Sequence, residues 1–193
     1  MSGDVFLHEI VKALFVYRRE VVFKRLANMY PDWGAVAGRR DLPISKRELI
    51  AVRPEAGLSR YLDVAWIVKG FNIKKYIATV GNVTRNFCHV IGFEIKTGEM
   101  REEWFEQMRG LIDQRDKVQR LMLRLGRCRE IDAGTMYYVF VVKRRYVEEV
   151  EERAKKIWYR SKAIPLEPWI SMAIPFLEEA LEKAKKMTGR DKQ

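Results

Sequence analysis

The apolar run MYYVFVV, residues 136–142, constrains the fold of this chain more than any other segment. A strand with one solvated face alternates polar and apolar residues, whereas this run is apolar at successive positions and so on both faces. It therefore predicts a central strand that is buried on both sides. Such a strand requires a sheet with helices packed against each face, which is an α/β arrangement.

Other segments supply the remaining strands and the helices. Short runs rich in β-branched and aromatic residues, bounded by Gly, Pro or Asn, predict strands. They are ELIAVR (48–53), LDVAWIV (62–68), KKYIATV (74–80) and CHVIGFEIK (88–96), with a short extended piece over 163–173. Apolar residues at spacings of three and four predict helices over 5–29, 100–125, 145–160 and 175–187. We expect one α/β domain over 1–193 with a central mixed sheet, its core at about 5–142 and a C-terminal helical and extended extension over 143–193.

The first predicted helix carries its apolar residues in one stripe. They are Val5, Phe6, Ile10, Ala13, Leu14, Tyr17, Val21 and Leu26. In the helix over 100–125, Trp104 and Phe105 belong to the packing face, and we interpret them as core residues rather than a base-stacking platform. The Lys- and Glu-rich stretches over 143–160 and 178–186 are typical of solvated helix faces with i,i+4 ion pairs.

The charge balance favours a polyanionic partner. Lys and Arg number 37 against 26 Asp and Glu, so the formal net charge is +11. An excess of this size indicates nucleic acid or another anionic surface. The alternative is a generic solvated surface, because sequences rich in Lys and Glu also occur in thermophiles.

Several features exclude other classes of protein. No segment approaches the ~18 uninterrupted apolar residues of a membrane span, and the N-terminus lacks the pattern of a signal peptide. Cys88 and Cys128 have no metal-ligand spacing, so we expect two ordinary packed thiols in a reducing compartment. With His8 and His89 as the only histidines, both interpreted as incidental, a Cys/His zinc site is excluded. We expect a soluble, cytoplasmic protein without membrane association.

A basic segment lies immediately before the strand predicted at 62–68. Its six cations are Arg39, Arg40, Lys46, Arg47, Arg53 and Arg60. Gly and Pro residues interrupt this stretch, and loops of such length are usually functional. We expect these side chains to hold backbone phosphates.

The segment GFEIK, residues 92–96, carries the candidate chemistry. Side chains alternate along a strand, so Glu94 and Lys96 point one way while Phe93 and Ile95 point the other. Gly92 is expected to leave room beside the charged pair. Asp63, in the preceding strong strand, is costly to desolvate unless a cation compensates it.

These groups could form a metal site. Two carboxylates on adjacent strands, Asp63 and Glu94, could share one Mg²⁺, with the backbone carbonyl of Ile95 and waters completing the oxygen shell. Lys96 would lie next to the metal-bound water and would orient or deprotonate it. The alternative for Glu94 and Lys96 is a surface ion pair, and for Asp63 a strand-start residue bonded to a backbone amide.

At these positions the sequence resembles the PD-(D/E)xK nuclease superfamily, which has the restriction-endonuclease-like fold. Leu62-Asp63 matches the first half-motif and Glu94-Ile95-Lys96 the second, and the resemblance covers roughly residues 5–142. It implies a core in the order αβββαβ and a further acidic residue on the N-terminal helix, for which Glu9 matches best. Leu62 stands where the family has proline, and the interval to Glu94 is longer than usual. Gln107 is similar to a glutamine of the exonuclease members. Leu111 stands where their tyrosine would be, so we discount Gln107 as a site residue.

The resemblance implies a Mg²⁺- or Mn²⁺-dependent DNA endonuclease without a small-molecule cofactor. Asp63 and Glu94 would bind the metal, with Glu9 as a lesser candidate, and Asp63, Glu94 and Lys96 would be catalytic. Members that cut two strands often act as homodimers, and a structure-specific enzyme such as a Holliday-junction resolvase, or a restriction or repair enzyme, suits a chain of this size. The alternative is a nucleic-acid-binding protein that keeps the fold without the chemistry.

Overall fold

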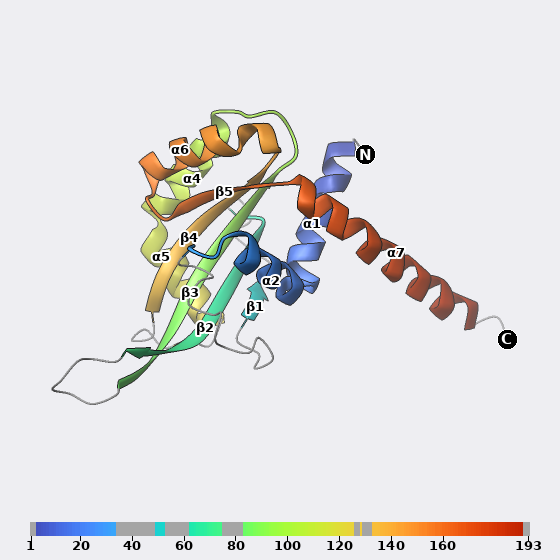
Figure 1. Ribbon diagram of the computed structural model, residues 1–193, viewed down its shortest axis with the longest axis horizontal. Coiled ribbons are helices and arrows are strands. Elements are labelled where there is room, and N and C mark those ends of the chain that lie inside the picture. The colour runs from blue at the N-terminus through green and yellow to red at the C-terminus, as the bar shows by residue number, and fades with distance from the viewer. Residues whose placement is uncertain are drawn as a thin grey trace.

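A five-stranded mixed sheet forms the centre of the molecule (Figure 1). The computed structural model describes residues 3–33, 49–52, 62–74, 83–125, 128 and 133–190. The strands are β1 (Leu49–Val52), β2 (Val64–Lys74), β3 (Val83–Lys96), β4 (Ala133–Val142) and β5 (Ser161–Pro165), and they lie in this order across the sheet. β1, β2 and β3 are antiparallel neighbours, whereas β4 runs parallel to β3 and β5 parallel to β4.

Helices cover both faces of this sheet. They are α1 (Gly3–Tyr17), α2 (Arg19–Met29), α4 (Glu103–Asp113), α5 (Arg115–Leu125), α6 (Val147–Ile157) and α7 (Glu167–Arg190), with a 3₁₀ turn at Arg144–Tyr146 before α6. α1, α2 and the start of α7 share one core cluster with the sheet, and α4, α5 and α6 share the other. The prediction of an α/β fold, a mixed sheet flanked by helices in the order αβββαβ, is confirmed.

β4 is the buried central strand that its apolar run predicts. Val139 and Val141 belong to the cluster on the α1 side, while Tyr138, Phe140 and Val142 belong to the cluster on the α4 side. All five side chains are inaccessible to solvent. The run is apolar at every position because each face of this strand meets a helical layer.

The N-terminal helix differs from its prediction. The stretch over 5–29 forms two helices that meet at Arg18, and the buried residues of this stretch are Val11, Leu14, Phe15, Val22, Phe23 and Leu26. Four of the residues expected in the stripe are nevertheless exposed, three of them on α1, before the break. These are Val5, Phe6, Tyr17 and Val21. The helix predicted over 100–125 also divides, into α4 and α5 at Gln114, while Trp104 and Phe105 are core residues as expected.

The strands around the candidate site are longer than predicted. β2 passes through Gly70 to Lys74, and β3 begins at Val83, because the extra residues pair with each other as an antiparallel ribbon. Residues 75–80 of the strand predicted over 74–80 lie outside the described residues. The last helix begins at Glu167 rather than at 175, with Pro168 in its first turn, where the missing N–H costs nothing.

The two cysteines are bonded to each other. Cys88, on β3, and Cys128, after α5, form a disulfide. The prediction of two free packed thiols is wrong, and the argument for a reducing compartment loses its support from the cysteines. The fold brings together residues that are 40 apart in the sequence, and their spacing gave no indication of this. In the parts of the chain that the structure describes, no helix combines the length and apolar character that crossing a membrane requires.

Gly92 serves packing rather than leaving space beside the charged pair. A Cβ added at Gly92 would lie 2.6 Å from Cδ2 and 2.9 Å from Cδ1 of Leu62. Leu62 is buried, so its side chain occupies the room that the sequence suggested was open. The packing of Leu62 therefore explains the glycine at position 92.

Gly92→Ala is expected to destabilise the protein by about 1–3 kcal/mol, because the buried side chain of Leu62 has to shift to admit the new methyl group. In a Leu62→Ala background the same change should cost much less, since the clashing methyl groups are gone. A double-mutant cycle from urea denaturation measures this coupling. Equal costs of Gly92→Ala in the two backgrounds would contradict the packing explanation.

Candidate active site

Asp63 is anchored on β3 at the point where β2 begins. Its backbone N–H donates to the Phe93 carbonyl at 2.9 Å, and its Oδ2 accepts the Ile95 N–H at 2.7 Å. Val64 pairs with Phe93 in the antiparallel register, so the next position outward places Asp63 beside Glu94. The carboxyl group of Asp63 is thus fixed at the end of β3 by two bonds to the strand.

Glu94 and Lys96 form an ion pair on the face of β3 that α4 covers. The Lys96 Nζ donates to Glu94 Oε1 at 2.5 Å and to Gln107 Oε1 of α4 at 3.0 Å. Glu94 is only 5% exposed, and its Oε2 is buried without a hydrogen-bond partner. Phe93 and Ile95 belong to the core on the opposite face. The predicted alternation is confirmed, while the alternative of a surface ion pair does not describe a glutamate that is this deeply buried.

The N-terminal helix contributes His8 directly and Glu9 indirectly. His8 Nε2 lies 3.0 Å from Asp63 Oδ1, and His8 Nδ1 lies 3.1 Å from Glu9 Oε1. Only the doubly protonated imidazolium can donate a hydrogen bond from both nitrogens. Glu9 is 56% exposed on its side chain and also lies 3.8 Å from Lys12 Nζ. Glu9 therefore reaches the site through His8.

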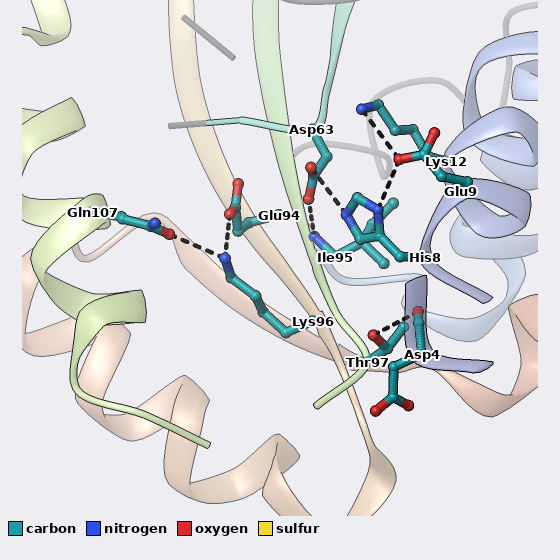
Figure 2. A network of polar contacts seen from close by, with 10 residues as sticks. All are labelled: Asp4, His8, Glu9, Lys12, Asp63, Glu94, Ile95, Lys96, Thr97 and Gln107. Carbon is teal, nitrogen blue, oxygen red and sulfur yellow. Dashed lines mark hydrogen bonds and ion pairs between the residues drawn. The ribbon is translucent and has the colours of Figure 1, made fainter. Parts of the chain in front are cut away.

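These contacts make one polar network across the end of β3 (Figure 2). Glu9 and His8 approach from α1, Asp63 stands at the start of β2, and Lys96 connects Glu94 to Gln107 on α4. Figure 2 shows the Asp63 carboxyl group turned towards His8 and the Glu94 carboxyl group turned towards Lys96. Thr97, the next residue after β3, donates through its Oγ1 to the Asp4 carbonyl at 3.1 Å and so ties this end of the strand to α1.

The electrostatics of Glu94 differ from those of its neighbours. Burial raises the pKa of Glu94 to about 8, and the negative charge of Asp63 acts in the same direction, against the opposing effect of Lys96. Burial also acts to raise the pKa of Asp63, but the hydrogen bond and charge of His8 and the Ile95 N–H outweigh it, so this pKa is lowered. The hydrogen bond to Asp63 raises the pKa of His8, against desolvation. The network therefore stabilises the ionised carboxylate of Asp63. The positive charge near Glu94 is too small to lower the pKa of its carboxyl group to the usual value.

The structure brings most of the predicted central residues together. Asp63, Glu94 and Lys96 lie in one network, and the Ile95 backbone participates through its N–H, while a role for its carbonyl stays a prediction. The six predicted phosphate-binding residues lie outside the described residues. These are Arg39, Arg40, Lys46, Arg47, Arg53 and Arg60.

Sequence reasoning missed two members of the network. His8 was interpreted as incidental and Gln107 was set aside, yet each contacts a central residue. Neither contact was expected, although helical spacing carried a signal for each. His8 is three residues before the buried Val11, and Gln107 is four before the buried Leu111. A half-buried polar side chain on the packing face of a helix needs a partner, and the candidate site supplies it.

Comparisons with known proteins add little to this site. No protein-family model matches the chain, and no curated protein matches it. Among solved structures, the chain is similar to the restriction endonuclease FokI bound to DNA, with 12% sequence identity and a TM-score of 0.39. That match covers 95% of this chain, which spans 29% of the FokI chain. A similarity this slight supports no argument about function, so any functional proposal has to rest on the residues of the site.

The raised pKa of Glu94 predicts how the stability of the metal-free protein depends on pH. The unfolded chain loses this proton near its ordinary pKa of 4.5, whereas the folded protein keeps it up to about pH 8. The free energy of unfolding should therefore fall as the pH rises between these values, by an amount on the order of a few kcal/mol. His8 also has a raised pKa, so its stabilising contribution likewise disappears as the pH rises.

Glu94→Gln separates the two contributions, because glutamine keeps the shape of the side chain without its titration. Denaturation in the presence of a chelator, repeated at pH values from about 5 to about 9, should show a shallower decline for this variant than for wild type. Identical pH profiles for the two proteins would show that Glu94 is not held in its neutral form.

Proposed function

We propose that this chain is a metal-dependent nuclease that hydrolyses phosphodiester bonds in DNA. Asp63 and Glu94 would hold Mg²⁺ or Mn²⁺, and Lys96 would act on the attacking water. The observation that carries the proposal is the buried Oε2 of Glu94, which has no hydrogen-bond partner although it belongs to a network with a second carboxylate and a lysine. A buried carboxylate oxygen without a donor is costly and calls for a counterion.

The residues present fit a hard divalent cation. Mg²⁺ prefers oxygen ligands and is commonly held by one or two carboxylates while it keeps several waters. Among the described residues, no group of three or more His, Cys, Asp or Glu side chains could hold a metal ion. Two carboxylates together with waters are consistent with that finding, whereas a closed site made only of protein ligands is not.

Each residue of the network would have a distinct task. A bound divalent ion would supply the positive charge that lowers the pKa of water and offsets the charge developing on the phosphate. Lys96 is held by Glu94 and Gln107, so its ammonium group has a defined position from which to orient a water. His8 and the Ile95 N–H fix Asp63, and this contact keeps its carboxyl group ionised and ready to bind a cation.

DNA is the partner proposed from the charge. The excess of 11 positive charges supports a polyanionic substrate, and the basic residues between 39 and 60 precede Asp63 directly in the sequence. The other predictions belong to the same proposal, namely a homodimer, endonucleolytic cutting and a structure-specific substrate such as a Holliday junction. The proposed metal site has two further candidate groups. The backbone carbonyl of Ile95 would be an additional ligand, and Glu9 would contribute indirectly, through His8.

A nucleic-acid-binding protein without catalysis is the second candidate. Both oxygens of Asp63 already have partners, from His8 and from the Ile95 N–H, and Lys96 occupies one oxygen of Glu94. A site in which three of the four carboxylate oxygens already have partners also fits a purely structural role. It would bind DNA with the salt dependence of phosphate contacts and with no response to divalent metal.

Cleavage of labelled branched, linear and single-stranded DNA distinguishes the two candidates. We expect cutting with Mg²⁺ or Mn²⁺ and none with EDTA. Lys96→Ala and Glu94→Gln should each reduce the rate by about 10²-fold or more, since the first removes the group proposed to act on the attacking water and the second a proposed metal ligand. Lys156→Ala is the matched control, because this lysine is 72% exposed on α6, where it pairs with Glu152.

Calorimetry with Mg²⁺ alone supplies a reading that does not depend on the choice of substrate. Wild type should bind the ion, and Asp63→Asn and Glu94→Gln should weaken binding by at least about tenfold. DNA binding without cleavage, combined with no Mg²⁺ binding, would favour the non-catalytic candidate. Cleavage by Lys96→Ala at the wild-type rate would remove the catalytic role of the lysine.

A further inference from the structure

A cavity of about 480 Å³ lies where the turn after α2 meets β4 and the start of β5. Its lining includes Tyr30 and Trp33 from that turn, Tyr137 from β4 and Lys162 from β5. Tyr137 packs against the core that α1 shares with the sheet, whereas Glu94 faces α4. None of the lining residues that the structure describes belongs to the network at the end of β3. The cavity is therefore separate from the candidate active site, and its volume lies within the range of about 300–1,000 Å³ that is usual for ligand sites.

Aromatic rings dominate the lining of this cavity. The ring centroids of Tyr30 and Trp33 lie 6.4 Å apart at an interplanar angle of 89°, and those of Trp33 and Tyr137 lie 6.1 Å apart at 87°. Such edge-to-face contacts give each ring a defined orientation. All three side chains are half-buried, and a fourth ring of the lining, Tyr159, is 65% exposed. Oriented rings that stay partly open to solvent around a hollow are suited to a flat, apolar ligand group.

Two cations of the cavity lie against these rings. The Arg160 guanidinium is 4.9 Å from the ring centroid of Tyr159 and 6.0 Å from that of Tyr137, and the Lys162 Nζ is 4.7 Å from that of Tyr30. A cation over an aromatic face keeps its charge, so it still attracts an anion. Burial raises the pKa of Tyr30 and of Tyr137, so both hydroxyl groups stay neutral and do not repel one.

The charges of the lining leave a positive excess. The Lys155 Nζ lies 2.5 Å from Oε1 of Glu151, and the Lys162 Nζ lies 3.4 Å from Oε2 of the same carboxylate. Two lysines therefore share one negative charge, and one positive charge of this group is left over. Arg160 adds a third cation and the exposed Asp32 a second carboxylate, so three cations against two carboxylates give a net charge of +1. The cavity thus suits a ligand that joins a flat ring to an anionic group.

We propose that this cavity binds one unpaired nucleotide, with its base packed among the rings of Trp33, Tyr137 and Tyr159 and its phosphate beside Arg160 and Lys162. Aromatic side chains next to cations are the usual means by which proteins hold unpaired bases. The nucleotide comes either from a single strand or from a free mononucleotide, because the recognition chemistry is the same. With a strand, the inference rests on the nucleic-acid partner of the proposed function. With either source it is independent of the metal site.

Calorimetry of the full chain in EDTA tests the ligand class, with AMP, adenosine and inorganic phosphate as probes. AMP should bind at least about tenfold more tightly than adenosine or phosphate, since only AMP engages both the rings and the cations. An adenine single strand of about ten nucleotides distinguishes the sources. Tighter binding of the strand than of AMP would identify single-stranded nucleic acid, and equal or weaker binding the free nucleotide. Binding of neither, or equal binding of AMP and adenosine, would overturn the proposal.

Variants of one exposed ring locate the binding in the cavity. Tyr159→Ala should weaken binding of the tighter probe by about fivefold or more, whereas Tyr159→Phe keeps the ring and should bind as wild type does. The matched control is Tyr17→Ala, because Tyr17 is 59% exposed on α1. An equal effect of the two alanine variants would contradict the assignment. Tyr159→Ala should also keep the Mg²⁺ affinity of wild type, so a failure of this inference is distinguishable from a failure of the proposed metal site.

Two substitutions at a single position test the role of the charge. Arg160→Gln should weaken binding by about tenfold and reduce its dependence on salt, because it removes a cation from the phosphate. Arg160→Lys keeps the charge and should retain most of the affinity. Equal binding by these two variants would show that the cation does not hold the phosphate, and the nucleotide assignment would then be wrong.

Discussion

The alternation of side chains along β3 is the constraint on which the rest of the structure depends. Phe93 and Ile95 project into the core under α1, and Glu94 and Lys96 project towards α4. Because successive side chains of a strand point to opposite faces, packing Phe93 and Ile95 into one core turns Glu94 and Lys96 to the other face, which the layer containing α4 covers. The same strand pairs with β2 on one side and with β4 on the other, so it has no freedom to slip by one residue, which would turn Glu94 and Lys96 into the core under α1.

The surrounding side chains compensate part of this buried charge. Lys96 satisfies one oxygen of Glu94, Gln107 satisfies the lysine, and the second glutamate oxygen stays without a donor. On the other side of the network, His8 and the Ile95 N–H fix Asp63 and lower its pKa. The metal-free protein thus holds one carboxyl group in a costly state. Residues that cost stability in this way are concentrated at functional sites, where a ligand offsets the cost.

The sequence predicted the fold best where periodicity alone decides. MYYVFVV identified β4 as a strand buried on both faces, and the alternation in GFEIK identified the face shared by Glu94 and Lys96. It predicted element ends less well. The break at Arg18 was not expected, and Val5, Phe6, Tyr17 and Val21 of the predicted stripe are exposed, because the apolar spacing of a segment does not show which helical face the rest of the chain covers. β2 and β3 exceeded their predicted lengths, since pairing with a neighbour stabilises residues that have weak strand preference on their own.

By itself the sequence determined the α/β class, the order of its elements and the charged pair of β3, because these follow from spacing within single segments. Only the tertiary structure decided which residues from distant segments meet. It placed His8 against Asp63, Gln107 against Lys96, Cys88 against Cys128 and Leu62 against Gly92. Each of these pairs joins residues that are between 11 and 55 positions apart, and their contact depends on how the helices and strands pack. Spacing within a segment carries no information about such contacts, so the complete network at the end of β3 emerged only in three dimensions.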